Sequence, residues 1–268
     1  MALLIFIGMV GYDNITDKAQ PTTPVQQEQQ KISKHEKSAA MALFVSLLPP
    51  KEEWPSPVHK FYLAFNMDEV IDPIRQNPNW TSLDAMSRDI PQALIAIEDH
   101  AFYNHGAIAV EGILRATLAN INAGEVVQGG STLTQQFVKN VFLSHEQSME
   151  RKIEEAILSL MLEDNYSKDE ILELYLNTTY FGAGSTGIRQ ASKTYFGKAP
   201  SALTLAEAAV IASLPYAPTG LNPLENPDGC KKRQLLVLAA MHKYGMINQG
   251  QLAEAKAEKI RLTNGTVM

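Results

Sequence analysis

The feature that most constrains the fold is the helical spacing of apolar residues from Ile90 onward. No run there alternates apolar and polar residues as a half-buried strand would, and no segment repeats. We therefore predict a mainly α fold. The expected helices cover residues 91–103, 110–122, 131–142, 148–163, 168–178, 186–195, 204–214, 228–244 and 248–258.

Local signals mark several helix ends. Pro91 suits the first turn of a helix, and Ser131 and Ser148 are expected N-caps. Ser167 and Glu170 have the spacing of a capping box. Loops are predicted where glycines or Pro and Asn gather, at residues 181–184 and 216–228.

The N-terminal part gives weaker signals. Residues 2–12 are apolar but too short to span a bilayer, and a cropped membrane anchor and a disordered end both stay open. A second apolar stretch, 39–48, favours a buried element over an interfacial helix. The predicted organisation is an apolar segment and linker at 1–37, an unassigned lead-in at 38–79, a catalytic domain at 80–258 and a C-terminal tail at 259–268.

Composition limits the classes of function. The 268 residues are 45% hydrophobic, enough for one sizeable core. A net charge of −6 argues against a nucleic-acid partner. Because the chain is acidic overall, any anionic substrate must be bound locally. Cys230 is the single cysteine, and no Cys/His cluster has metal-ligand spacing.

Glu98 is the first candidate for catalysis. Its helical neighbours Leu94, Ile95, Ala101 and Phe102 are apolar, which predicts a poorly solvated carboxylate. Desolvation raises a carboxyl pKa and suits it to accept a proton near neutral pH. The alternative, a helical glutamate satisfied by polar neighbours or solvent, is equally compatible with the spacing.

The helix at 148–163 carries a second candidate. Glu155 is expected to point away from the core, beside Arg151 and Lys152 on a polar face. A solvated face of salt bridges is the ordinary interpretation of such a pattern. The expected core stripe consists of Ile153, Ala156, Ile157, Leu160 and Met161.

A polar segment at 128–140 lies between these helices. Two glycines followed by hydroxyl residues expose backbone N–H groups at a helix N-terminus, which favours an anion. Ser131 and Gln136 offer neutral hydrogen bonds, and Lys139 offers a positive charge to a diphosphate. The alternative is a capped helix with a polar outer face.

Four strings occur in order and together resemble the peptidoglycan glycosyltransferase family, found as monofunctional enzymes and as the N-terminal domain of class A penicillin-binding proteins. The likeness covers about residues 80–258. After the last of the four strings, it continues through the stretch that ends at Leu238. The strings are Glu98-Asp99-x-x-Phe102-Tyr103-x-His105, Gly130-Ser131-Thr132-x-Thr134-Gln135-Gln136-x-x-Lys139-Asn140, Arg151-Lys152-x-x-Glu155 and Ser167-Lys168-Asp169-Glu170-Ile171-Leu172-Glu173-Leu174-Tyr175-Leu176-Asn177.

The resemblance implies a lysozyme-like helical lobe with a smaller, membrane-associated jaw lobe. It implies polymerisation of lipid II into β-1,4-linked glycan with release of undecaprenyl diphosphate and inversion at the anomeric carbon. The implied partners are lipid II, the lipid-linked nascent strand, the membrane surface and cell-wall synthesis proteins. The implied location is the outer face of the bacterial cytoplasmic membrane. No transpeptidase activity is expected, because Ser-x-x-Lys and Lys-Thr-Gly are absent.

The resemblance also implies roles for residues. Glu98 matches the catalytic base and Glu155 the second essential glutamate, near the diphosphate. The sequence requires no cofactor, and a Mg²⁺ ion held through Glu155 stays open. Six residues match positions that contact phosphates or substrate: Ser131, Gln136, Lys139, Lys152, Arg151 and Asn177. The motif that contains Asn177 also has a partly structural role. The resemblance further implies that Asp99, Phe102 and His105 shape the cleft around Glu98.

Two positions depart from the family pattern. Ala107 stands where a glycine is usual, and Gln147 stands where a basic residue is typical. We expect Gln147→Arg to raise turnover, despite repulsion from Arg151 and Lys152.

Two rival functions remain. One is a lysozyme-type lytic enzyme acting on finished peptidoglycan, and the other is a non-catalytic scaffold for wall synthesis. The diphosphate-binding set argues against the first rival. The presence of both glutamates argues against the second.

Overall fold

The computed structural model describes residues 62–63, 66–109, 112, 130–143 and 148–268. The chain divides into one unit at 1–60 and a second at 61–268, and the fold below is that of the second unit. The predictions for residues 1–37 and 39–48, nearly all of the predicted helix at 110–122, and Gln147 lie outside the described residues.

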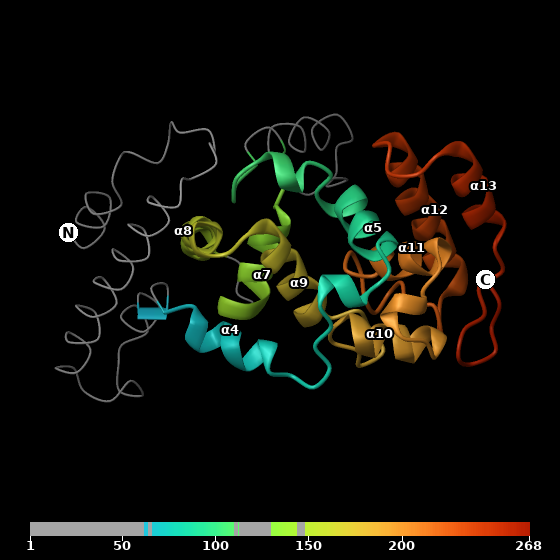
Figure 1. Cartoon of the computed structure of the whole chain (residues 1–268), viewed down its shortest axis with the longest axis horizontal. Helices are drawn as coiled ribbons and strands as arrows, with labels where there is room; N and C mark the ends of the chain where they lie inside the picture. The colour runs from blue at the N-terminus through green and yellow to red at the C-terminus, as the bar shows by residue number, and fades with distance from the viewer. Residues whose placement is uncertain (1–61, 64–65, 110–111, 113–129, 144–147) are drawn as a thin grey trace. The chain divides into compact units, whose positions relative to one another are not determined.

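The second unit is mainly α-helical, which confirms the predicted fold class. Its described residues form helices and short 3₁₀ turns, with two isolated β-bridges and no strand (Figure 1). The 3₁₀ turns are Leu83–Ala85, Phe102–Asn104 and Pro200–Ala202. The helices are α4 (Asp68–Arg75), α5 (Asp89–Glu98), α7 (Leu133–Phe142), α8 (Met149–Asn165), α9 (Lys168–Thr178), α10 (Ile188–Phe196), α11 (Leu205–Ser213), α12 (Pro227–Lys243) and α13 (Gln249–Ala257).

Two predicted helix starts are confirmed by their hydrogen bonds. The Ser148 hydroxyl accepts from the backbone N–H of Arg151 at the start of α8. Ser167 and Glu170 form the expected capping box at the start of α9. Each cap satisfies N–H groups that have no partner inside the helix.

The cap expected at Ser131 is wrong by one residue. Thr132 caps α7, because its hydroxyl accepts from the N–H of Gln135 while the Gln135 side chain accepts from the N–H of Thr132. The glutamine three residues after Thr132 completes this reciprocal box, and no such partner follows Ser131 at that spacing. The Ser131 hydroxyl is thereby left for another contact.

The helix expected at 91–103 ends early, at Glu98. Asp99 leaves the helical conformation, with φ −157° and ψ 70°. Its carboxylate accepts from the backbone N–H of Leu133, 3.1 Å away, and lies 2.6 Å from His105 Nε2. These two tertiary bonds replace the continuation of the helix. Phe102 begins a separate short turn and is fully buried.

The helices pack in two groups. In the α5 group, α5, α11 and α12 pack on one another, and α13 packs on α12 and α11. In the α7 group, α7 packs on both α8 and α9. The helix α10 contacts α9 and α11 and so joins the groups (Figure 1). One continuous hydrophobic core runs through both, so each group can hold side chains in fixed positions relative to the other.

The compact unit extends beyond the predicted 80–258 boundaries at both ends. Before residue 80, Ile71 of α4 is fully buried and Tyr166 donates a hydrogen bond to Asp68. After residue 258, Ile260 and Leu262 are buried in the core. Both flanks therefore contribute to the stability of the folded unit.

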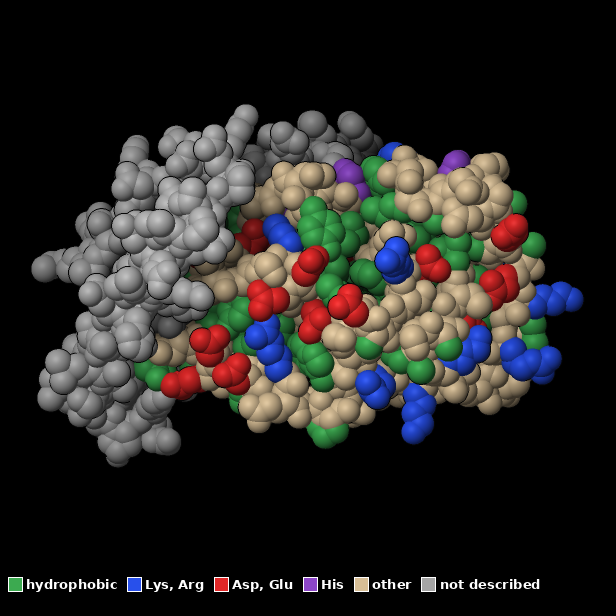
Figure 2. Space-filling view, viewed as in Figure 1, with side chains coloured by type: hydrophobic (Ala, Val, Ile, Leu, Met, Phe, Trp, Pro, Cys, Tyr) green, Lys and Arg blue, Asp and Glu red, His purple; other side chains and the backbone are tan. Residues whose placement is uncertain are grey.

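The surface carries charges of both signs. On the face shown in Figure 2, acidic and basic side chains lie among one another, with hydrophobic side chains visible between them. Ion pairs account for part of this pattern: Arg75 lies 2.9 Å from Glu170, and Lys168 lies 2.7 Å from Glu163.

Candidate active site

Glu98 lies where the two helix groups meet. It is the last residue of α5, and its side chain is half-buried. The Gln136 amide, on α7, donates to Glu98 Oε2 at 3.1 Å. The hydroxyl of Tyr175, on α9, donates in turn to Gln136 Oε1 at 3.0 Å. Since the Tyr175 hydroxyl sets the orientation of the amide, the chain Tyr175–Gln136–Glu98 holds the carboxylate by a neutral donor.

Burial raises the pKa of Glu98 above its ordinary value, as expected from its apolar neighbours. The hydrogen bond from Gln136 and the positive charges of Arg233 and Lys139 oppose this rise, while the negative charge of Asp99 adds to it. A carboxylate in this environment is a stronger base than one in water, which is what proton abstraction near neutral pH requires.

Asp99 and His105 form a second contact set beside Glu98. The two ring nitrogens of His105 lie 2.6 Å from Asp99 Oδ1 and 2.6 Å from the Gly106 carbonyl oxygen. Chiefly the bond to Asp99 raises the pKa of His105, which favours the imidazolium form. The other Asp99 oxygen takes the N–H of Leu133. An internal carboxylate therefore occupies the first-turn N–H that was expected to be open to phosphate.

The expected orientation of α8 is wrong. Glu155 is buried, at 1% exposure, while Ile153 and Leu160 of the expected core stripe are each 55% exposed. Ion pairs explain the reversal: Arg151 Nη1 lies 3.0 Å from one Glu155 oxygen, and Lys152 Nζ bonds the other. Two cations offset the cost of burying one carboxylate, so the polar side of α8 faces inward.

The cations of this cluster reach α7. Lys152 Nζ also donates to the Ser131 hydroxyl at 3.0 Å, so the start of α7 and the face of α8 are bonded to each other. Arg151 Nε is buried without a hydrogen-bond partner in the described structure. Lys139, on α7, is exposed and makes no ion pair with any described residue. Cations here outnumber the single Glu155 carboxylate, so the cluster suits a polyanion.

The surroundings of Glu155 do not fit a magnesium ion. Each of its carboxylate oxygens is bonded to a cation, from Arg151 or Lys152. Within the described part of the chain, no cluster of three or more acidic, histidine or cysteine side chains could hold a metal ion. Mg²⁺ usually needs oxygen ligands that are free to approach it. We therefore assign Glu155 to holding the cations.

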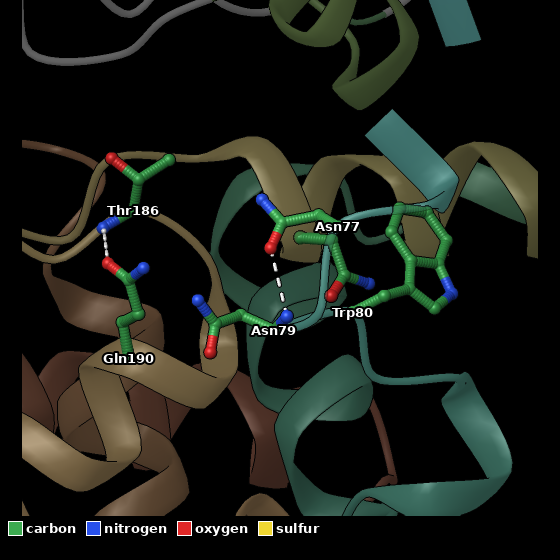
Figure 3. A pocket seen from close by; sticks show the side chains of 6 residues that line it. Asn77, Asn79, Trp80, Thr186 and Gln190 are labelled. Atoms are coloured by element: carbon green, nitrogen blue, oxygen red, sulfur yellow. Dashed lines mark hydrogen bonds between the residues drawn. The ribbon is translucent and has the colours of Figure 1, made fainter. Parts of the chain in front are cut away.

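The Asn177 side chain binds backbone groups. Its amide oxygen accepts from the N–H of Thr81 at 2.9 Å, and its NH₂ donates to the Thr81 carbonyl at 2.8 Å. These bonds fit the partly structural role of the motif that contains Asn177. Asn177 also lines a small pocket of about 60 Å³ together with Asn77, Asn79, Trp80, Thr186 and Gln190 (Figure 3). None of the other predicted site residues lines this pocket.

Two residues near Glu98 were not among the predicted site residues. Tyr175 belongs to the fourth string and is 1% exposed. From the sequence it could have been predicted only as a core residue, not as a hydrogen-bond partner of Gln136. Arg233 stands in the stretch toward Leu238, where nothing in the spacing connects it to Glu98. Both act across elements far apart in the sequence, so a helical pattern alone does not reveal them.

Comparison with known proteins agrees with these motifs. The family model described as Transglycosylase matches residues 67–242. The chain is 44% identical to "Penicillin-binding protein 1A" of Neisseria flavescens, over 69% of this chain and 23% of that protein. It is 40% identical to "Putative transglycosylase" of Cupriavidus necator, over 72% of this chain and 84% of that protein.

A crystal structure of penicillin-binding protein 1A from Haemophilus influenzae matches 49% of this chain and 16% of that chain, at 33% identity and a TM-score of 0.35. The chain spans about a quarter of the length of the penicillin-binding proteins it matches: 23% of the Neisseria flavescens protein and 28% of penicillin-binding protein 1F of Bacillus subtilis. The match over residues 67–242 and the Cupriavidus relative confirm the predicted family. This chain belongs to the transglycosylase family.

Proposed function

We propose that this protein is a peptidoglycan glycosyltransferase that polymerises lipid II. The observation that carries the proposal is the contrast around α7. Glu98 is half-buried with a raised pKa and a neutral amide partner on α7. Arg151 and Lys152 of α8, which packs on α7, bond the single carboxylate of Glu155, and Lys139 of α7 is exposed without an ion pair to a described residue. A base beside a polycationic cluster suits transfer of a sugar from a diphosphate donor.

The reaction begins at the acceptor hydroxyl. Glu98 takes the proton from the 4-hydroxyl of the acceptor disaccharide as its oxygen forms a bond to the donor's anomeric carbon. The bond from that carbon to the lipid diphosphate breaks, and the electron pair leaves with the diphosphate. Attack opposite the leaving group converts an α-linked donor into a β-1,4 linkage. The proton then passes from Glu98 to solvent.

The cations stabilise the departing charge. Lys139 is exposed and available, and Arg151 has a buried, unpartnered Nε–H. Glu155 and the Ser131 hydroxyl hold Lys152 in place from two sides. Groups fixed in advance in this way cost little reorganisation when charge develops, and removing one such donor typically costs about 3 to 4 kcal/mol.

A lipid-linked substrate fits the outer side of α8. Met149, Ile153 and Leu160 are 78%, 55% and 55% exposed on the helix that carries Arg151 and Lys152. Exposed apolar side chains gathered along one helix are typical of surfaces that meet a membrane. We therefore propose attachment at the outer face of the cytoplasmic membrane, with α8 in the membrane-associated jaw.

Among the described residues, no helix combines the length and the apolar character that crossing a bilayer requires.

A lytic enzyme is the second candidate, because a carboxyl group with a raised pKa can also serve as a general acid. The cation cluster favours synthesis, since cleavage of finished glycan releases no diphosphate. Both activities can be measured with the same protein.

The deciding experiment incubates purified protein with labelled lipid-linked disaccharide and, separately, with finished peptidoglycan. We expect polymer from the lipid substrate, degradable by lysozyme, and no soluble fragments from finished wall. Fragments without polymer would establish the lytic alternative. Neither product, from folded protein in detergent or vesicles, would favour a scaffold.

A further inference from the structure

The small pocket that Asn177 lines is built from neutral polar groups and one tryptophan (Figure 3). Asn77, Asn79 and Trp80 come from the connection after α4. Thr186 precedes α10, and Gln190 lies in the first turn of that helix. None of the lining residues is charged. Such a site selects a neutral ligand that both donates and accepts hydrogen bonds.

The aromatic part of the pocket is held in place by two bonds to charged side chains. The indole N–H of Trp80 donates to Glu173 Oε1 at 3.1 Å. The Trp80 carbonyl oxygen accepts from Arg189 Nη2, also at 3.1 Å. Since both charged side chains are occupied in fixing Trp80, the indole ring has a defined position before any ligand arrives.

The amide side chains of the pocket keep free hydrogen-bonding groups. Asn77 Oδ1 accepts from the N–H of Asn79 at 2.9 Å, and Gln190 Oε1 accepts from the N–H of Thr186 at 3.2 Å. The NH₂ groups of Asn77 and Gln190 and the whole side-chain amide of Asn79 make no hydrogen bond to a described residue. Figure 3 shows Asn77 and Asn79 on one side of the pocket and Thr186 and Gln190 on the other. Donors are therefore available from two sides, and Asn79 adds an acceptor.

We propose that this pocket binds the acetamido group of an N-acetylated sugar in a glycan strand. The acetamido carbonyl would accept from the NH₂ of Asn77 or Gln190, and the acetamido N–H would donate to the amide oxygen of Asn79. A pocket of about 60 Å³ has room for a group of that size but not for a whole sugar residue. The sugar ring stays at the rim, where its apolar face can lie against the Trp80 indole.

The pocket is a glycan contact beyond the proposed reaction. None of its lining residues bonds to Glu98, to Arg151 or to Lys152. A strand held here therefore leaves the base and the cations free for the next sugar. The choice of a glycan as the carrier of the acetamido group rests on the proposed function, whose product contains N-acetylated sugars throughout.

The test is an equilibrium titration of the folded protein with tetra-N-acetylchitotetraose, a soluble neutral oligomer. Cellotetraose is the matched ligand, because it carries a hydroxyl in place of each acetamido group. We expect a dissociation constant of about 1 mM for the acetylated oligomer, as suits one sugar residue in a small site, and binding at least about tenfold weaker for cellotetraose.

Variants place the binding in the pocket. Asn79→Ala and Gln190→Ala should each weaken binding of the acetylated oligomer by about fivefold, the loss expected from one hydrogen bond. Gln249→Ala is the control, because Gln249 is exposed on α13 and does not line the pocket. Glu98→Gln should bind like the parent, because Glu98 does not line the pocket either. Asn79 is exposed, so its variant decides if Gln190→Ala does not fold.

Four results would overturn the inference. They are no binding by the parent up to about 20 mM oligomer, equal affinity for the two oligomers, unchanged affinity in Asn79→Ala, and loss of binding in Glu98→Gln. Failure of the proposed function looks different, because the parent would then make no polymer from the lipid-linked disaccharide while the pocket variants still lowered its affinity for the acetylated oligomer.

Discussion

Glu98 and Glu155 are two glutamates in one molecule with opposite surroundings. Glu98 ends a helix, is half-buried, and takes its hydrogen bond from a neutral amide. Glu155 lies within α8, is almost fully buried, and bonds two cations directly. The first carboxylate is left reactive by burial, and the second is neutralised by its partners.

This difference shows how the same side chain can serve two tasks. A group with a raised pKa and no ion pair can take a proton, as Glu98 is placed to do. A carboxylate bound by two cations holds those cations in place instead. The comparison predicts that the glutamates differ in which property fails when each is changed, and four substitutions test it.

The largest effect is expected from Glu98→Gln. The amide keeps the shape but cannot accept the acceptor's proton, so polymerisation should fall by about 10²- to 10⁴-fold. The free energy of unfolding should change little, because a neutral amide replaces a partly buried carboxylate. Rates of polymer formation and urea unfolding measure both properties. The control is Glu254→Gln, at an exposed position of α13; a Glu98→Gln rate near the parent's would exclude Glu98 as the base.

Glu155→Gln should lower both stability and activity. An amide cannot neutralise Arg151 and Lys152, so positive charge stays partly unpaired in a buried place. The free energy of unfolding should fall by about 1 to 3 kcal/mol, between the values typical of exposed and of fully buried pairs, because Lys152 is partly exposed. Polymerisation should fall by about tenfold to a hundredfold at equal folded concentration. Unchanged stability would mean that the two cations find other partners.

Lys139→Ala should affect turnover alone. Its ammonium is exposed and makes no ion pair with described residues, so folding does not depend on it. With one cation fewer at the diphosphate, the donor complex should be weaker. We therefore expect about a tenfold loss of rate. Lys256→Ala, on α13, removes a comparable exposed charge as the control. Equal rates for both variants across a donor titration would remove Lys139 from the site.

Tyr175→Phe is expected to have the smallest effect. It removes the hydroxyl that donates to Gln136 Oε1, so the amide can rotate and its bond to Glu98 weakens. A loss of about 1 kcal/mol in transition-state stabilisation corresponds to roughly a fivefold lower rate. A steady-state assay measures it. A rate equal to the parent's would show that Gln136 keeps its orientation without Tyr175.

Sequence spacing was sufficient for most of the helices. The predicted segment 168–178 matches α9, and 148–163 begins where α8 begins, because caps such as Ser148 are local signals. The end of α5 was beyond such reasoning. Asp99 leaves the helix for partners at Leu133 and His105, and those contacts form only in the folded chain.

The motifs pointed to a set of candidate site residues, but the orientation of one helix was predicted wrongly. Among the candidates were Glu98 and the cationic residues, and the structure shows Lys152 bonded to Glu155. The helical pattern of α8, however, placed its apolar residues inside. Burial of a charged residue depends on the ion pairs that it makes, and an exposed apolar face depends on what it meets outside the chain. The spacing of residues in the sequence predicts neither these ion pairs nor what the exposed face meets.

The most direct test of the central claim is binding, measured without chemistry. Affinity for a lipid-linked diphosphate disaccharide is compared in the parent, Glu98→Gln and Glu155→Gln by equilibrium titration in detergent. Because Glu98 acts on the acceptor's proton and Glu155 holds the cations, Glu98→Gln should bind within about twofold of the parent, and Glu155→Gln should bind at least about tenfold more weakly. Equal loss of affinity in both variants, or loss in Glu98→Gln alone, would contradict the division of tasks between the two glutamates.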